Sequence, residues 1–280
     1  MYLSIGKGQH VDEIRFSLLS ADRFHSDDAE WSIRVYTDHP ESFADLRADV
    51  QIVPPETATS WSGPHGYVYR GKIAALAEAL TEPGTSRAAI IDGDTYFTRS
   101  PAHLFSRIAP GRTVIHLREG RPRAAETAAL RTVLSEYTPV DTAGAPWGIV
   151  ETETLWNSGV VGVHRSDAAL CHEALYLNDQ LLDHRFAEQS HTAEMVAFGV
   201  VLARRSKITE CHDVVTHYWP ADIRDPFAVR LRETWSAPSA DPASAFARLW
   251  EDRPREGLNR RTKFWIKRLA AKAGVEVGRA

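Results

Sequence analysis

The segment Ala88–Phe97, AAIIDGDTYF, joins the pattern of a buried strand to two carboxylates that follow it directly. A short continuous apolar run such as Ala88–Ile91 is typical of a parallel strand covered by helices on both faces. Open α/β sheets bind ligands just beyond the carboxyl ends of such strands. We therefore expect Asp92 and Asp94 at the mouth of a ligand site, where Gly93 allows a tight turn or a close approach of the backbone.

The hydrophobic pattern of the rest of the chain favours an α/β fold. Short apolar runs alternate with longer segments of helical period, as in βαβ units around a mostly parallel sheet. We expect strands at 2–5, 32–36, 51–53, 88–91, 113–117 and 155–164, and helices at 14–24, 69–80, 124–134 and 191–203. The long interruption between 118 and 156 is more typical of a functional loop region than of filler.

The composition is that of a globular protein. Of the 280 residues, 43% are hydrophobic, and the net charge of −4 gives no global attraction for nucleic acid. Cys171 and Cys211 are the only cysteines, which argues against a disulfide scaffold and fits a reducing cytosol. No apolar stretch is long enough to span a bilayer, and the first residues lack the pattern of a signal peptide. We expect a cytoplasmic protein.

Two carboxylates one residue apart suit a hard divalent cation. Mg²⁺ and Mn²⁺ prefer oxygen ligands, and such an ion would also neutralise the phosphate charge of an anionic substrate. The alternative for Asp92 and Asp94 is an Asp-Gly turn that closes the strand and leaves both acids in water. The local residues leave both interpretations open.

Four short strings occur in a fixed order along the chain: YRGKIAAL at 69–76, IIDGDTYF at 90–97, WNSGVVGV at 156–163 and THYW at 216–219. Together they resemble the nucleotide-sugar glycosyltransferases of the GT-A fold, most closely the bacterial family-8-like galactosyl- and glucosyltransferases. The resemblance implies an α/β GT-A catalytic domain at 1–222, with a mixed, mostly parallel central sheet and flanking helices. Residues 223–280 would form a helical, partly basic extension.

The resemblance also implies a metal site. Asp92 and Asp94 match the family's DxD motif, which holds a divalent cation, Mn²⁺ or Mg²⁺, on the donor diphosphate. His217 matches the late histidine ligand, and neutral imidazole accepts Mn²⁺ alongside carboxylates. The alternative for His217 is an interior histidine beside Tyr218 and Trp219.

Donor-binding roles follow from the same resemblance. Arg70 matches the basic residue that reaches the donor phosphates, and Lys72 would assist it, although either could be an ordinary cation on a helix face. Asp92 and Gly93 would lie against the diphosphate. Asp38 follows the second expected strand, where the family often reads the base or ribose, although a Thr-Asp turn needs no ligand to explain it.

Two residues match positions near the transferred sugar. Asn157 matches the family's asparagine there, since an amide can both donate to and accept from hydroxyls; its alternative is a turn residue before a glycine. Glu194 lies in HTAEMVAFG, which resembles the segment that brings an acid or amide beneath the sugar ring. The alternative is a glutamate favoured by the helix dipole alone.

The chain departs from the family pattern after His217 and has one further feature, a basic segment at 253–272. After its late histidine the family has a Gly and a Lys that grips the leaving diphosphate. Neither stands at the expected spacing after His217, so the metal, Arg70 or a later residue such as Arg224 would have to serve. Residues 253–272 interleave basic and aromatic side chains. This segment is either a packing helix or an amphipathic contact with the inner face of a membrane.

These observations favour a hexosyltransferase that uses a divalent metal and a nucleotide-sugar donor, with UDP as carrier by resemblance, and a glycan or lipid-linked acceptor. A non-catalytic nucleotide-sugar-binding module and a Mg²⁺-dependent phosphatase remain as alternatives. The phosphatase is disfavoured because the motif follows about three strands and no convincing acidic pair stands downstream to complete its Mg²⁺ site. The sequence chooses neither the sugar nor the stereochemical outcome.

Overall fold

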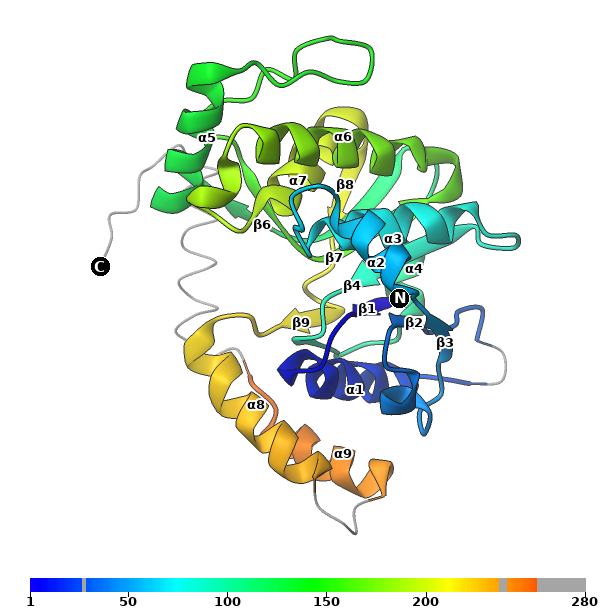
Figure 1. Ribbon diagram of the computed structural model, residues 1–280. Helices are drawn as coiled ribbons and strands as arrows, with labels where there is room; N and C mark the ends of the chain where they lie inside the picture. Colours follow the sequence, from blue (N-terminus) through cyan, green and yellow to red (C-terminus); the bar gives the residue numbers. More distant parts are fainter. Residues whose placement is uncertain (27–28, 237–240, 256–280) are drawn as a thin grey trace. The chain divides into compact units, whose positions relative to one another are not determined.

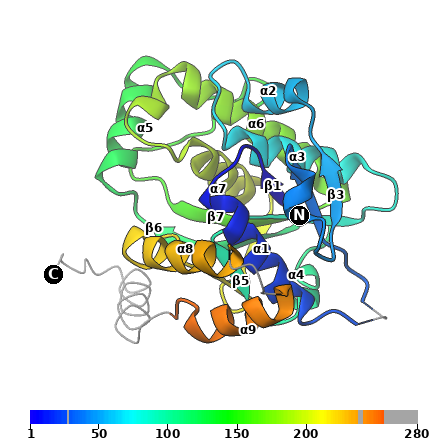
Figure 2. The same cartoon turned by 60° about the horizontal axis from the view of Figure 1, so that its bottom comes forward.

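The computed structural model describes residues 1–26, 29–236 and 241–255. The chain divides into two compact units, Met1–Trp219 and Pro220–Ala280. Figures 1 and 2 show their helices and strands. The acids and the late histidine of the expected metal site all belong to the first unit.

The first unit contains a three-stranded and a four-stranded sheet. The parallel sheet has the order β1-β2-β3, and the second has the order β4-β7-β6-β8, in which β7 is antiparallel to both of its neighbours. The strands are β1 (Tyr2–Ser4), β2 (Arg34–Thr37), β3 (Asp49–Ile52), β4 (Arg87–Ile91), β6 (Arg112–Gly120), β7 (Leu155–His164) and β8 (Lys207–Glu210).

Backbone hydrogen bonds of Met1 connect the two sheets. Its amino group donates to the Ala89 carbonyl at 2.8 Å, and its carbonyl accepts from the Ile91 amide at 3.0 Å. In a parallel pair, the amide and the carbonyl of one residue bond to two different residues of the neighbouring strand, as those of Met1 do with Ala89 and Ile91. The combined order is therefore β3-β2-β1-β4-β7-β6-β8, a mixed and mostly parallel sheet as expected.

Helices cover both faces of this sheet (Figure 1). They are α1 (Gln9–Asp22), α2 (Pro55–Ser62), α3 (Arg70–Thr81), α4 (Ala102–Phe105), α5 (Ala124–Glu136), α6 (Ala169–Asp183) and α7 (Ala193–Arg205), with short 3₁₀ turns at Pro40–Phe43, Arg165–Asp167 and Phe186–Glu188. Side chains of β4 alternate between the two cores, because successive residues of a strand point to opposite faces. Ile90 packs in the core that contains α3, α6 and α7, whereas Ile91 packs with Ile14 of α1.

The expected α/β fold class is confirmed, and the element bounds differ in detail. The strand expected at 155–164 has those bounds, whereas β6 continues to Gly120. The first helix begins at Gln9 rather than at 14, because its first turn is polar and carries Asp12, which the helix dipole favours there. Helix α6 was not anticipated, although its buried Ala174, Leu177 and Leu181 have helical spacing.

The described residues of the second unit form two helices, α8 (Ala221–Trp235) and α9 (Pro242–Asp252), which contact each other. Asp241 caps α9, since its carboxylate accepts from the amides of Ala243 and Ser244. The basic segment at 253–272 lies outside the described residues beyond 255. Within the described ranges, no helix has the length and apolar character needed to cross a bilayer.

Candidate active site

The late histidine reaches the DxD segment through strand pairing. β5 (Thr95–Phe97) pairs antiparallel with β9 (Val215–His217), in a register that sets Thr95 opposite His217. The Tyr218 amide then donates to the Asp94 carbonyl at 3.0 Å. The Asp92 amide donates to the Gly159 carbonyl at 2.8 Å, so the turn after β4 stays attached to β7. These bonds bring residues 123 positions apart in the sequence into contact.

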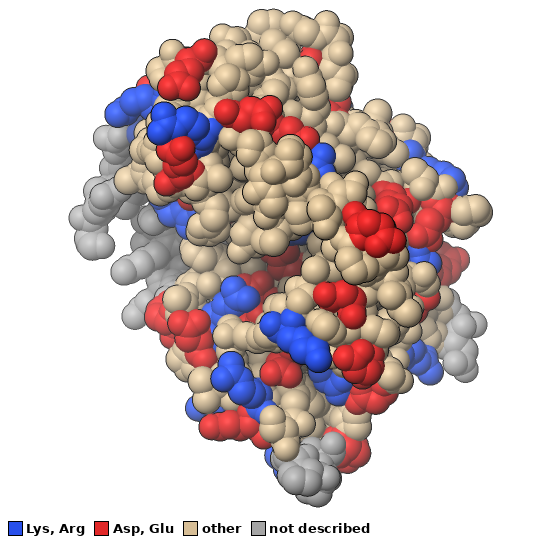
Figure 3. All heavy atoms as spheres, in the orientation of Figure 1, with Lys and Arg blue, Asp and Glu red and all other residues tan. Residues whose placement is uncertain are grey.

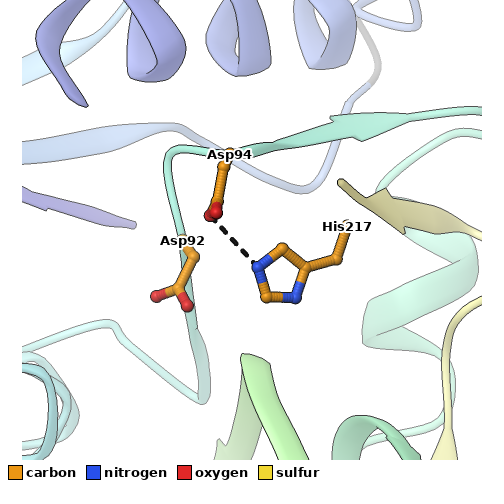
Figure 4. Close-up of side chains that lie close together, drawn as sticks. All are labelled: Asp92, Asp94 and His217. Carbon is orange, nitrogen blue, oxygen red and sulfur yellow. Dashed lines mark hydrogen bonds and ion pairs between the residues drawn. The ribbon is translucent and has the colours of Figure 1, made fainter. Parts of the chain in front are cut away.

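Asp92, Asp94 and His217 form a group that fits a divalent cation (Figure 4). Their potential ligand atoms all lie within 4.8 Å of one another, and His217 Nε2 is 3.1 Å from Asp94 Oδ1. The side chains of Asp94 and His217 are buried, and that of Asp92 is 27% exposed. Two carboxylates and one imidazole suit Mn²⁺, and open coordination positions would remain for substrate oxygens.

The charge around His217 is strongly negative. Burial alone would lower the pKa of its imidazole, but the charge and hydrogen bond of Asp94, together with the charge of Asp92, outweigh burial and raise that pKa. A raised pKa reports a site that favours positive charge. A metal cation would compete with the proton for this position.

Lys72 of α3 lies against the same acids. Its ammonium is 2.7 Å from Asp92 Oδ1 and 3.6 Å from Glu194 Oε1, and it donates to the Ser158 carbonyl at 3.2 Å. Burial would lower the pKa of Lys72, but the charges of Asp92 and Glu194 outweigh burial and raise it. The lysine is therefore a buried ammonium held by two carboxylates.

Glu194 lies in the first turn of α7 and is buried. Its Oε1 accepts from the Ser158 hydroxyl at 3.0 Å, and its Oε2 accepts from the Tyr67 hydroxyl at 3.0 Å. Burial and the adjacent Glu194 charge raise the pKa of Tyr67, so this hydroxyl keeps its proton. Sequence reasoning missed Tyr67, although it stands close before the YRGK string, and its contact with α7 is visible only in the fold.

Arg70 and Lys72 have different surroundings, because residues two apart on a helix point about 200° away from each other. The Arg70 guanidinium binds both carboxylate oxygens of Asp179 on α6, at 2.7 and 2.9 Å. It also donates to the carbonyls of Ser60 and Trp61. The structure thus brings Lys72 to the DxD acids and engages Arg70 with α6 and the end of α2.

Asp38 and Gly93, expected at the donor, both make contacts within the protein. The Asp38 carboxylate accepts from the Gly6 amide at 2.9 and 3.1 Å, which ties the end of β2 to the turn after β1. A Cβ on Gly93 would lie 2.8 Å from Ile14 Cγ1, so the glycine allows α1 to approach the turn. Its close approach is therefore to a helix of the same chain.

Asn157 of β7 lies next to His217 of this group. Its Oδ1 is 2.9 Å from His217 Nδ1 and also accepts from the Gly159 amide at 3.0 Å, while its Nδ2 donates to Glu119 Oε1 at 2.8 Å. Nothing in the sequence indicated Glu119. Its contact with Asn157 depends on the pairing of β6 with β7.

Solved structures similar to this chain include glycosyltransferases. An active-site mutant of LgtC has a TM-score of 0.50 and 13% identity over 93% of this chain and 98% of that one. The galactosyltransferase LgtC in complex with donor and acceptor sugar analogues has a TM-score of 0.49, with 11% identity over 94% and 99%. Mouse xyloside xylosyltransferase 1 has a TM-score of 0.45, with 13% identity over 75% and 84%. No protein-family model and no curated protein sequence matches the chain.

The chain has the GT-A glycosyltransferase fold. The likeness to LgtC extends over almost the whole length of both chains, and the observed sheet and flanking helices agree with it. The sequence resemblance is confirmed at the level of the fold. The group Asp92, Asp94 and His217 lies where such a fold binds ligands, beyond the carboxyl end of β4.

Proposed function

We propose that the protein is a metal-dependent glycosyltransferase that moves a hexose from a nucleoside-diphosphate sugar, with UDP as the expected carrier, to a hydroxyl acceptor. The observation that supports this most is the convergence of Asp92, Asp94 and His217 beyond β4. The GT-A fold adds support, and LgtC, which has a similar structure, was solved with donor and acceptor sugar analogues.

The charges of the group favour a divalent cation. Asp92, Asp94 and Glu194 contribute three negative charges and Lys72 one positive charge, so the group carries about −2 when His217 is neutral. When bound, Mn²⁺ or Mg²⁺ would cancel this charge and act as a Lewis acid on the departing diphosphate. Without the cation, the negatively charged diphosphate would lie beside carboxylates of the same charge.

The residues of the chain would position the donor. Lys72 forms an ion pair with the Asp92 carboxylate, and it would supply a positive charge to the donor diphosphate. Because Arg70 binds Asp179 and no lysine stands at the family's spacing after His217, Lys72 is the basic residue that we assign to the leaving group. Glu194, held by Ser158, is the group that we place near the transferred sugar, with Asn157 next to His217.

The acceptor and the location are proposed on the sequence alone. We expect a glycan or lipid-linked acceptor and a cytoplasmic protein, which residues 253–272 would hold at the membrane periphery. On the face drawn in Figure 3, acidic and basic side chains of the described residues are interspersed rather than gathered by sign. The described residues on this face form no basic patch of the kind that binds nucleic acid.

Donor hydrolysis tests the function without a guess at the acceptor. The protein is incubated with a panel of nucleotide sugars and Mn²⁺, Mg²⁺ or chelator, and released nucleoside diphosphate is measured. We expect metal-dependent turnover of one donor, loss of that turnover in Asp94→Asn, and retention in Asp45→Asn, a control whose acid pairs with Arg15 elsewhere. Binding without turnover would instead indicate a non-catalytic module. Turnover of simple phosphate esters would indicate a phosphatase.

A further inference from the structure

A chain of hydrogen bonds runs from the metal ligand His217 to a glutamate on a neighbouring strand. His217 Nδ1 is 2.9 Å from Asn157 Oδ1, and Asn157 Nδ2 is 2.8 Å from Glu119 Oε1. Asn157 is 5% exposed and the His217 side chain 6%, so the inner part of this chain is shielded from water. Glu119 is half-buried at its outer end.

The direction of each bond follows from the chemistry of the groups. An ionised carboxylate only accepts, so Asn157 must turn its NH₂ toward Glu119. The amide oxygen then faces His217, and because this oxygen also only accepts, the proton of the imidazole must lie on Nδ1. Neutral His217 therefore presents the lone pair of Nε2 to the side where Asp94 lies, 3.1 Å away. This is the tautomer that a metal at Nε2 requires.

A turned amide would give the opposite result. If Asn157 presented its NH₂ to Nδ1, that nitrogen would have to accept, and the proton would move to Nε2 and block the metal position. The Gly159 amide, which donates to Asn157 Oδ1 at 3.0 Å, opposes this rotation from one side. Glu119 opposes it from the other, because only the correct orientation gives its carboxylate a donor.

Irregular strand pairing places Glu119. Arg118 pairs with Trp156 and Gly120 pairs with Leu155, so Glu119 lies at a bulge in β6 with no residue directly opposite. Bulges re-aim side chains and are frequent next to active sites. His116, at the other irregularity of β6, packs edge-on against the His217 ring, with ring centres 5.4 Å apart. The imidazole is thus held by its neighbours as well as by its hydrogen bond.

We propose that Glu119 is a positioning residue for the metal ligand His217 and acts through Asn157. The inference rests on the metal site of the proposed function and deepens it. It also changes the expected role of Asn157. The amide oxygen already accepts two hydrogen bonds, and one hydrogen of the NH₂ group is donated to Glu119, so only the second hydrogen is left for a sugar.

Direct titration of Mn²⁺ into the full chain, without nucleotide, tests the proposal. We expect Glu119→Ala to weaken Mn²⁺ binding by about 10- to 100-fold, the range typical when a partner of a metal-bound histidine is lost. Glu119→Gln should bind almost as tightly as the unaltered protein, since its amide oxygen can still accept from Asn157. Glu153→Ala, which removes a similarly half-buried glutamate bound to Arg204, is the matched control and should have no effect.

A second measurement needs no metal. In the metal-free protein, above the pKa of His217, the ring nitrogen signals in NMR should report the proton on Nδ1, and Glu119→Ala should move part of it to Nε2. A residue that touches only sugar, or only stabilises the fold, would leave both the tautomer and Mn²⁺ affinity unchanged, and that result would overturn the proposal. Equal weakening in the Gln and Ala variants would also overturn it. Failure of the unaltered protein to bind Mn²⁺ would instead reject the metal site itself.

Discussion

Gly159 leaves the space that His217 occupies. A Cβ at Gly159 would lie 2.3 Å from His217 Nδ1 and 2.9 Å from Asn157 Oδ1, closer than side chains approach in folded proteins. In Gly159→Ala the imidazole must therefore move by about 0.7 Å or more, and His116 packs edge-on against the same ring. We expect overpacking to cost about 1–3 kcal/mol of stability.

The same shift should weaken metal binding. Ligand distances in metal sites tolerate about 0.2 Å, so an imidazole displaced by several times that amount no longer supplies Nε2 correctly. We expect at least about a tenfold loss of Mn²⁺ affinity in Gly159→Ala. Gly162→Ala is the matched control on the same strand, because its Cβ would lie 2.6 Å from the flexible end of Ile108 and touches no metal ligand.

Thermal unfolding and Mn²⁺ titration of both variants separate the two effects. Both should lose stability, and only Gly159→Ala should lose Mn²⁺ affinity. If Gly159→Ala binds Mn²⁺ as the unaltered protein does, the reasoning on the His217 position is refuted. Equal loss of affinity in both variants would refute it too, since overpacking in β7 would then be the common cause.

Three further predictions concern charged and titratable groups. Lys72→Met should destabilise the metal-free protein by about 3 kcal/mol, because Asp92 loses its partner, and Mn²⁺ should restore part of this in denaturant titrations; unchanged stability would contradict the pairing. Arg70→Ala should lower the melting temperature but leave nucleotide affinity unchanged, and a large loss of affinity would return Arg70 to the phosphates. Burial lowers the pKa of His116 to about 3, so its neutral form contributes stability that is lost as pH falls from about 6.5 through about 3. In His116→Gln, the number of protons taken up on unfolding in this pH range should fall by up to one, measured as the slope of the free energy of unfolding against pH. An unaltered slope would contradict the lowered pKa of His116.

Local pattern was sufficient for the fold class. The apolar runs of β4 and β7 are continuous because helices cover both faces, and their residues were recognisable as strands without knowledge of their partners. The position of Asp92 and Asp94 beyond β4 follows from the same pattern. Sheet order was not readable, since the reversal of β7 between β4 and β6 depends on pairing between distant segments.

The surroundings of the site required the fold itself. The sequence assigned both Arg70 and Lys72 to the donor phosphates and did not indicate which of them would face the acids. That choice depends on Asp179, which the sequence places 109 residues beyond Arg70. Glu119 was not anticipated because its position depends on a bulge, and a bulge leaves no signature in the hydrophobic pattern.

The central claim is that Asp92, Asp94 and His217 hold a divalent cation that binds the diphosphate of a nucleotide. Calorimetric titration of UDP into the protein, with Mn²⁺ and then with chelator, tests it most directly. We predict binding with Mn²⁺, binding weakened at least tenfold with chelator, and no Mn²⁺ dependence in Asp94→Asn. Equal UDP affinity with Mn²⁺ and with chelator, in the unaltered protein, would contradict the claim.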